Sequence, residues 1–112
     1  MEDQVLKFPK WKNADMVINY EETDKPGSHW IALALRDGKS FYFDSYAMPI
    51  LGEVIKYLKS FIPMKNQYRN HIKCQRFSEV TCGNKCLEFL YRMQNVSTQN
   101  GFISVVTTMT FH

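Results

Sequence analysis

The chain has 112 residues, a net charge of +3, 45% hydrophobic residues and three cysteines. This length suits a single domain, 1–112, with a marginal core, so the chain is either a minimal domain or a piece of a longer protein. No segment approaches the roughly 20 apolar residues of a membrane span, and the N-terminus lacks the features of a signal peptide. The odd cysteine count argues against a disulfide framework. We therefore expect a soluble monomer of a reducing compartment, the cytoplasm or the nucleus.

The clearest predicted element is a hairpin. A short strand is expected at 15–20 and a loop at 21–27. The apolar runs 30–35 and 41–44 flank Asp37-Gly38, the strongest short signal for a two-residue turn. Such a turn opposes Arg36 with Lys39. One face then carries His29, Ile31, Leu33, Asp44 and Tyr46, and the other carries Trp30, Ala32, Ala34, Phe41 and Phe43. Both faces are largely apolar, so we expect both to be covered.

Helical periodicity follows the hairpin. The stripe of apolar residues in 49–61 predicts a helix with Pro49 in its first turn and Pro63 after its end. A further strand is expected at 66–75 and a second helix at 82–94. The segment 96–112 fits either helix or strand. The whole set predicts an α+β domain with a mainly antiparallel sheet.

His29 and Asp44 are candidates for a base and the group that orients it. In the predicted register they are diagonal neighbours on one face, with backbones about 7–8 Å apart. A carboxylate on one imidazole nitrogen fixes the tautomer and leaves the other nitrogen to take a proton. Taken singly, each residue has an ordinary alternative role, as a surface histidine and as an aspartate that begins a turn.

Cys82 is the candidate nucleophile because it precedes Gly83 at the predicted start of a helix. The free N–H groups and the dipole of a first helical turn stabilise a thiolate there. Cys74 and Cys86 fit the more usual role of small buried residues. Gln75 lies seven positions before Cys82. Its side-chain amide and the backbone N–H of Cys82 would form an oxyanion hole with two donors.

Three segments together resemble the adenovirus-type cysteine proteases, the adenains, some of which are encoded by large DNA transposons or other DNA viruses. The segments are Gly27-Ser28-His29-Trp30-Ile31-Ala32-Leu33, Tyr42-Phe43-Asp44-Ser45-Tyr46 and Gln75-(six residues)-Cys82-Gly83. The wider clan includes the SUMO-removing Ulp proteases, with the same order of His, Asp, Gln and Cys. The resemblance implies a papain-like α+β fold whose central helix carries the nucleophile, with His29, Asp44, Gln75 and Cys82 in the catalytic roles.

The resemblance also implies a cysteine endopeptidase that cleaves after glycine and processes viral or mobile-element proteins, in the host cell or packaged in a virion. Trp30 would crowd the substrate channel; its alternative place is the core, with Phe41 and Phe43. No cofactor is required, although family members use a peptide or DNA activator. The chain is much shorter than the adenovirus enzyme and lacks a counterpart of the cysteine that joins that enzyme to its activating peptide, so a truncated copy is an alternative.

Other interpretations stay open. A SUMO or ubiquitin-like protein protease is the alternative enzyme, and an inactive binding module is the alternative without chemistry. His71, Cys74, Cys82 and Cys86 have residue types that bind zinc, but they lack paired C-x2-C knuckles, and we expect no metal site. A basic stretch interleaved with aromatic residues could contact DNA weakly or form a solvated face. Its bases are Lys56, Lys59, Lys65, Arg69, Lys73 and Arg76.

Overall fold

The computed structural model describes residues 9–20, 29–73 and 82–110, with the side chains of Tyr20 and Cys82 left undescribed. Four strands form one sheet in the order β1-β2-β3-β4. They are β1 (Asn13–Tyr20), β2 (His29–Arg36), β3 (Lys39–Asp44) and β4 (Gln67–Arg69). The first three run antiparallel, and β4 runs parallel to β3. The α+β class is confirmed, but the sheet is mixed because β4 is reached by a crossover through a helix.

The hairpin register is confirmed. Ile31 pairs with Asp44, and Arg36 pairs with Lys39. Asp37 and Gly38 both have positive φ angles, 47° and 86°. Positive φ at both central positions is what a type I′ turn requires, and aspartate followed by glycine adopts it readily. The turn therefore sets which residues of β2 and β3 share a face.

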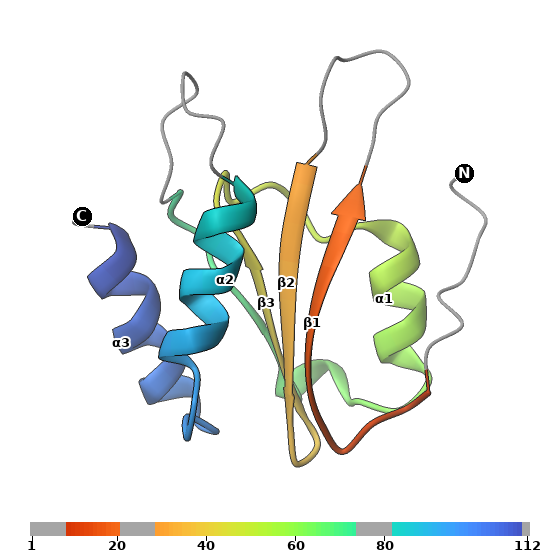
Figure 1. The fold of residues 1–112 in the computed structure, drawn as a ribbon. Helices are drawn as coiled ribbons and strands as arrows, with labels where there is room; N and C mark the ends of the chain where they lie inside the picture. Colours follow the sequence, from red (N-terminus) through yellow and green to blue (C-terminus); the bar gives the residue numbers. More distant parts are fainter. Residues whose placement is uncertain (1–8, 21–28, 74–81, 111–112) are drawn as a thin grey trace.

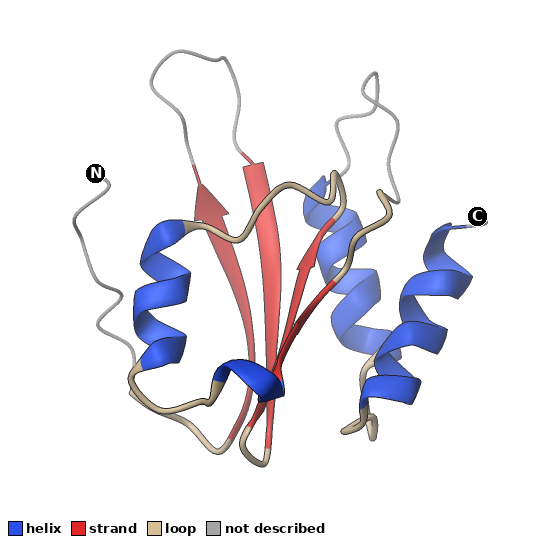
Figure 2. Cartoon of the chain, turned by 180° about the vertical axis from the view of Figure 1, so that it is seen from behind, coloured by secondary structure: helices blue, strands red, loops and turns tan. Residues whose placement is uncertain are grey.

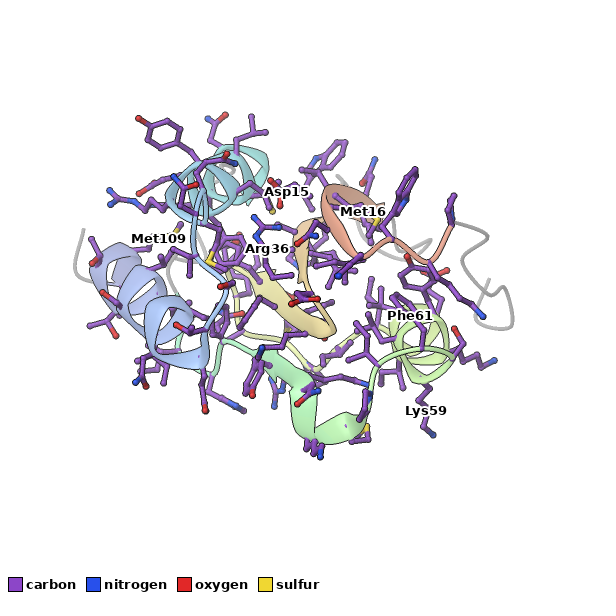
Figure 3. The ribbon with its side chains drawn as sticks, turned by 90° about the horizontal axis from the view of Figure 1, so that it is seen from below. Asp15, Met16, Arg36, Lys59, Phe61 and Met109 are labelled. Atoms are coloured by element: carbon purple, nitrogen blue, oxygen red, sulfur yellow. The ribbon has the colours of Figure 1, made fainter. Side chains whose placement is uncertain are left out.

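Helices cover both faces of the sheet, as expected (Figures 1 and 2). Helix α1 (Gly52–Lys59) packs on one face, and α2 (Cys82–Arg92) and α3 (Gln99–Thr110) lie on the other. In Figure 3, Met109 of α3 and the partly buried Phe61 lie on opposite sides of the sheet.

Each face has its own hydrophobic core. The buried core on the α1 side consists of Ile18, Ile31, Leu33, Leu35, Tyr42, Val54, Tyr57, Leu58 and Ile62. The buried core on the α2 side consists of Ala32, Ala34, Phe41, Phe43, Cys86, Phe89, Met93, Phe102, Val105, Val106 and Met109. A chain of this length thus builds two thin cores that share one sheet.

Several predicted bounds differ from those of the structure. Helix α1 begins at Gly52, so Pro49 is not in its first turn; Leu51 precedes the helix and its N–H donates to the Tyr42 hydroxyl at 3.3 Å. Strand β4 covers only 67–69, because 64–66 form a short 3-10 helix and the pairing with β3 ends at Arg69. Helix α2 ends at Arg92, and Asn95 adopts a left-handed φ of 65° soon after. The ambiguous segment 96–112 contains a helix, α3.

Within the described residues no helix is long and apolar enough to cross a membrane.

Arg36 joins the sheet to the end of α2. Its guanidinium forms an ion pair with Asp15 at 2.7 Å and donates to the carbonyl of Ala14 on β1. It also donates to the carbonyls of Met93 and Val96, at 3.3 and 3.1 Å. Figure 3 shows Arg36 and Asp15 close together at this end of the sheet. Carbonyls that follow the last turn of a helix lack helical partners, so Arg36 supplies their donors.

Arg36→Met should lower the free energy of unfolding by about 2–3 kcal/mol, because the stem is kept while charged hydrogen bonds to several carbonyls are lost. Urea denaturation measures the loss. Arg92→Met is the matched control, since the partner of Arg92 among the described residues is Glu88, at 2.9 Å on an exposed helix surface. Its cost should be at most about 0.5 kcal/mol. Equal costs for the two variants would contradict the role given to Arg36.

Candidate active site

Three element ends converge at one end of the sheet. His29 is the first residue of β2, Asp44 is the last residue of β3, and Cys82 is the first residue of α2. Figure 1 shows the start of β2, the end of β3 and the start of α2 at the same end of the molecule. The predicted base, its orienting group and the predicted nucleophile position therefore belong to one region.

His29 and Asp44 are in direct contact. His29 Nε2 lies 2.9 Å from Asp44 Oδ1, and the aspartate side chain is only 3% exposed. Among the described residues, however, Nε2 has no hydrogen-bond partner of good angular geometry. The two atoms are therefore within ion-pair distance, but they do not form a well-aligned hydrogen bond. Hydrogen bonds in active sites are often poorly aligned before a substrate binds.

A tight turn after β3 holds the carboxylate of Asp44. Oδ1 accepts the backbone N–H of Tyr46 at 2.8 Å, and the N–H of Ala47 donates to the Asp44 carbonyl at 2.8 Å. Ala47 adopts a φ of 54°, in the left-handed region that costs a residue with a Cβ about 1–2 kcal/mol. Backbone strain of this kind concentrates at functional sites. The sequence motif around Asp44 thus encodes a strained turn as well as an acid.

The ring of Tyr46 stacks on the imidazole of His29. Their ring centroids are 5.5 Å apart and the ring planes are inclined by 28°. Stacking on one side and the carboxylate at Nε2 together restrict the orientation of the imidazole. The predicted register had placed His29 and Tyr46 on one face, and the ring contact confirms that prediction.

Sequence reasoning missed Asn70, which lies one residue beyond β4. Its side chain is buried and bonds to both backbone polar groups of Asp44: Oδ1 accepts the N–H at 2.9 Å, and Nδ2 donates to the carbonyl at 2.7 Å. A single asparagine in a polar stretch gives no sequence signal for such a role. Only the parallel pairing of β4 with β3 brings it to Asp44.

Trp30 lies between the sheet and the start of α2. It is partly buried against the core on the α2 side. A Cβ built at Gly83 would lie 3.6 Å from Trp30 Cδ1 and 3.9 Å from Nε1, so the indole rests on the first turn of the helix. This contact places Gly83, and therefore the adjoining backbone of Cys82, beside the beginning of β2. Trp30 thus packs against the core that contains Phe41 and Phe43, as the core alternative requires, while its role in a substrate channel stays a prediction.

The remaining candidates differ in how far the structure describes them. Gln75 and Cys74 lie outside the described residues, as does the Cys82 side chain. Cys86 is fully buried in the core on the α2 side, which confirms its expected place. His71 is exposed. Among the described residues no cluster of three or more His, Cys, Asp or Glu side chains could hold a metal ion.

The basic residues singled out in the sequence are spread over several elements. Lys56 and Lys59 are exposed on α1, and Lys65 is exposed on the short 3-10 helix. Arg69 is half-buried on β4, Lys73 follows it, and Arg76 lies outside the described residues. Contact with DNA through these bases stays a prediction.

Tyr42 links the candidate site to the core on the α1 side. It lies two residues before Asp44 and is buried in the core on the α1 side. Burial raises the pKa of its phenol well above the usual value, and the nearby Asp44 carboxylate raises it further. The hydroxyl therefore stays neutral across the physiological range, accepting the Leu51 N–H and anchoring the chain between the Asp44 turn and α1.

A scan against known protein families and a search of curated proteins both find no match for this chain. The resemblance to the adenains thus rests on the short segments around His29, Asp44 and Cys82.

The contact at Nε2 predicts the tautomer of His29. In the neutral imidazole of His29 the proton should lie on Nε2, the nitrogen in contact with Asp44. Nitrogen-15 chemical shifts of the two ring nitrogens measure this directly. The exposed His71 should show a mixture of tautomers in the same spectrum, and Asp44→Ala should give His29 such a mixture. A proton on Nδ1 in the wild type would show that Asp44 does not orient the ring.

Proposed function

We propose that this chain is a cysteine peptidase of the adenain type, with Cys82 as nucleophile and His29 as its base. The 2.9 Å contact between His29 and Asp44 is the observation that carries the proposal. An imidazole held by a buried carboxylate at the end of a sheet has one nitrogen left for proton transfer. The first turn of α2 lies beside it through the contact between Trp30 and Gly83.

The mechanism assigns each group one task. The Cys82 thiol gives its proton to His29 Nδ1, and the thiolate attacks the peptide carbonyl carbon to form a tetrahedral oxyanion. His29 returns the proton to the departing amine as the C–N bond breaks, which leaves a thioester on Cys82. A water molecule then gives a proton to His29 and attacks the thioester carbonyl carbon; the C–S bond breaks, the peptide acid leaves, and His29 returns the proton to the Cys82 sulfur. The Asp44 carboxylate stabilises the imidazolium in both halves of the reaction.

The position of α2 determines how the two groups would meet. His29 shares the α1 face of the sheet with Ile31, whereas α2 packs on the opposite face through Trp30. Side chains of consecutive strand residues point to opposite faces, so a base in mid-strand could not reach a group on α2. His29 is the first residue of β2, where no further strand residue intervenes. The thiol and imidazole would therefore meet around the strand end.

The first turn of α2 also favours an anionic intermediate. Its free backbone N–H groups and the positive end of the helix dipole lie where Cys82 begins the helix. The Cys82 N–H and the Gln75 side-chain amide would be the two oxyanion donors, with Gln75 assigned from its sequence spacing to Cys82.

Cys82 should be the cysteine that alkylates fastest in the folded protein and the one required for hydrolysis of fluorogenic peptides. Cys82→Ala should lower turnover by at least about 10⁴-fold. Iodoacetamide labelling followed by mass spectrometry should show slow reaction at Cys86, which is fully buried. His29→Ala should slow labelling of Cys82, because the thiolate loses its base.

Cys74→Ser is the matched control and should leave turnover unchanged. The proposal is wrong if the wild-type chain folds but hydrolyses no peptide, whether glycine-rich or derived from SUMO. That outcome would favour the inactive binding module. Preferential release of SUMO or another ubiquitin-like protein would instead identify the alternative enzyme.

Substrates should carry glycine immediately before the cleaved bond. The indole of Trp30 borders the first turn of α2 and would narrow the channel, and glycine allows the closest approach of a backbone. Trp30→Ala should therefore relax the preference in a peptide-library screen, provided that a thermal melt confirms the fold. Trp11→Ala, at an exposed position, is the control and should change nothing. Free acceptance of large residues by the wild type would refute a narrow channel.

A further inference from the structure

The amide side chain of Asn70 has an unusual set of partners. It is 3% exposed, and within the described part of the chain its side-chain hydrogen bonds go to backbone groups. Oδ1 accepts the Asp44 N–H at 2.9 Å, while Nδ2 donates to the carbonyls of Asp44 at 2.7 Å and of Ile72 at 3.2 Å. The backbone N–H of Asn70 donates to the Tyr42 carbonyl at 3.3 Å. The side chain therefore uses its acceptor and both donor positions on two segments.

The side-chain hydrogen bonds of Asn70 extend the hydrogen-bonding pattern of the sheet beyond the end of β4. The parallel pairing of β3 with β4 ends at Tyr42 and Arg69, two residues short of Asp44. Beyond that point the Asn70 side chain offers Asp44 one acceptor and one donor, the same pair of groups that a neighbouring strand would offer. The backbone of Asp44 is thus fixed on the β4 side by a single side chain.

Fixing this backbone fixes the carboxylate. The Asp44 side chain is short, and its Oδ1 already accepts the Tyr46 N–H at 2.8 Å, so little freedom remains once the backbone is held. The same oxygen contacts His29 Nε2. A shift of the Asp44 backbone would therefore also displace the imidazole of His29.

We propose that Asn70 is a positioning residue of the active site, which acts through Asp44 to hold the proton of His29 on Nε2 and the ring in its productive orientation. The catalytic part of this inference rests on the proposed peptidase function. The part that concerns the imidazole does not, because the tautomer of His29 can be read in the absence of any substrate.

The side-chain chemistry at position 70 is demanding. Aspartate has the same size and can still accept the Asp44 N–H, but it lacks both donors and would place an oxygen against the Asp44 carbonyl. Serine keeps a donor and an acceptor but is too short to reach both backbone groups. Asparagine alone among residues of this size offers an acceptor and two donors from one planar group.

The test uses Asn70→Asp and Asn70→Ser in the full chain, with Asn100→Asp on the exposed start of α3 as the matched control. Both Asn70 variants should shift the nitrogen-15 resonances of His29 toward the mixed-tautomer values of Asp44→Ala. Peptide turnover should fall about 10²-fold with little change in KM, as expected for a misplaced catalytic group. The control should match the wild type in both measurements.

A double-mutant cycle separates positioning from general stability. In the Asp44→Ala background, Asn70→Ser should cause no further loss of turnover, because the group through which Asn70 acts has gone. A further loss as large as in the wild type would overturn the proposal. So would folded Asn70 variants with full turnover and an unchanged His29 tautomer, or unfolding of both variants, which would make Asn70 purely structural. A wild type without peptidase activity, but with the Asn70-dependent tautomer, would refute the proposed function alone.

Discussion

The register of the β2–β3 hairpin is the constraint on which both cores and the candidate site depend. Asp37 and Gly38 take positive φ angles in a two-residue turn, which leaves one way to pair the strands. A slip of one residue would turn every side chain of one strand to the other face of the sheet. Ile31 and Leu33 would then lie on the same face as Phe41 and Phe43. The contact between His29 and Asp44 would be lost by the same slip, so the turn at one end of the hairpin sets the geometry of the candidate site at the other end.

Several features around Asp44 cost folding free energy, which is scarce in so small a domain. A carboxylate is buried there, Ala47 adopts a left-handed backbone, and a buried amide is devoted to the backbone of one residue. Burying a charge requires a partner and hydrogen bonds, and Asp44 has both in His29 and the Tyr46 N–H. A turn that served only to join β3 to α1 would need neither the buried charge nor the strain. This cost in folding free energy is consistent with the functional role proposed for the carboxylate.

Local sequence signals predicted the parts of the fold that are set locally. The hairpin, its register and the apolar stripe of α2 follow from periodicity and from one dipeptide, and with them comes the approach of His29 to Asp44. The parallel addition of β4 and the role of Asn70 depend on a crossover whose end point is fixed only by packing, so no local pattern encodes them. The start of α1 differs from the prediction because Leu51, whose N–H donates to the Tyr42 hydroxyl, has a non-helical ψ of 137° and precedes the helix. The segment of α3 has mixed helix and strand propensities, and burial of Phe102 and Met109 against the sheet decides between them.

A geometric conflict explains why the proposed site lies at the end of the sheet. A thiol benefits from the first turn of a helix, and that helix must pack on a face of the sheet to bury its apolar stripe. A base that is oriented by a carboxylate on the neighbouring strand must lie on the same face of the sheet as that carboxylate. Here that face is the one that α1 covers. In the middle of the sheet the two requirements place the groups on opposite sides of a packed layer. Where β2 begins and β3 ends, the layer stops, and groups from both faces can approach one another. His29, Asp44 and Cys82 each occupy the terminal residue of their element at this edge, as a site assembled from both faces requires.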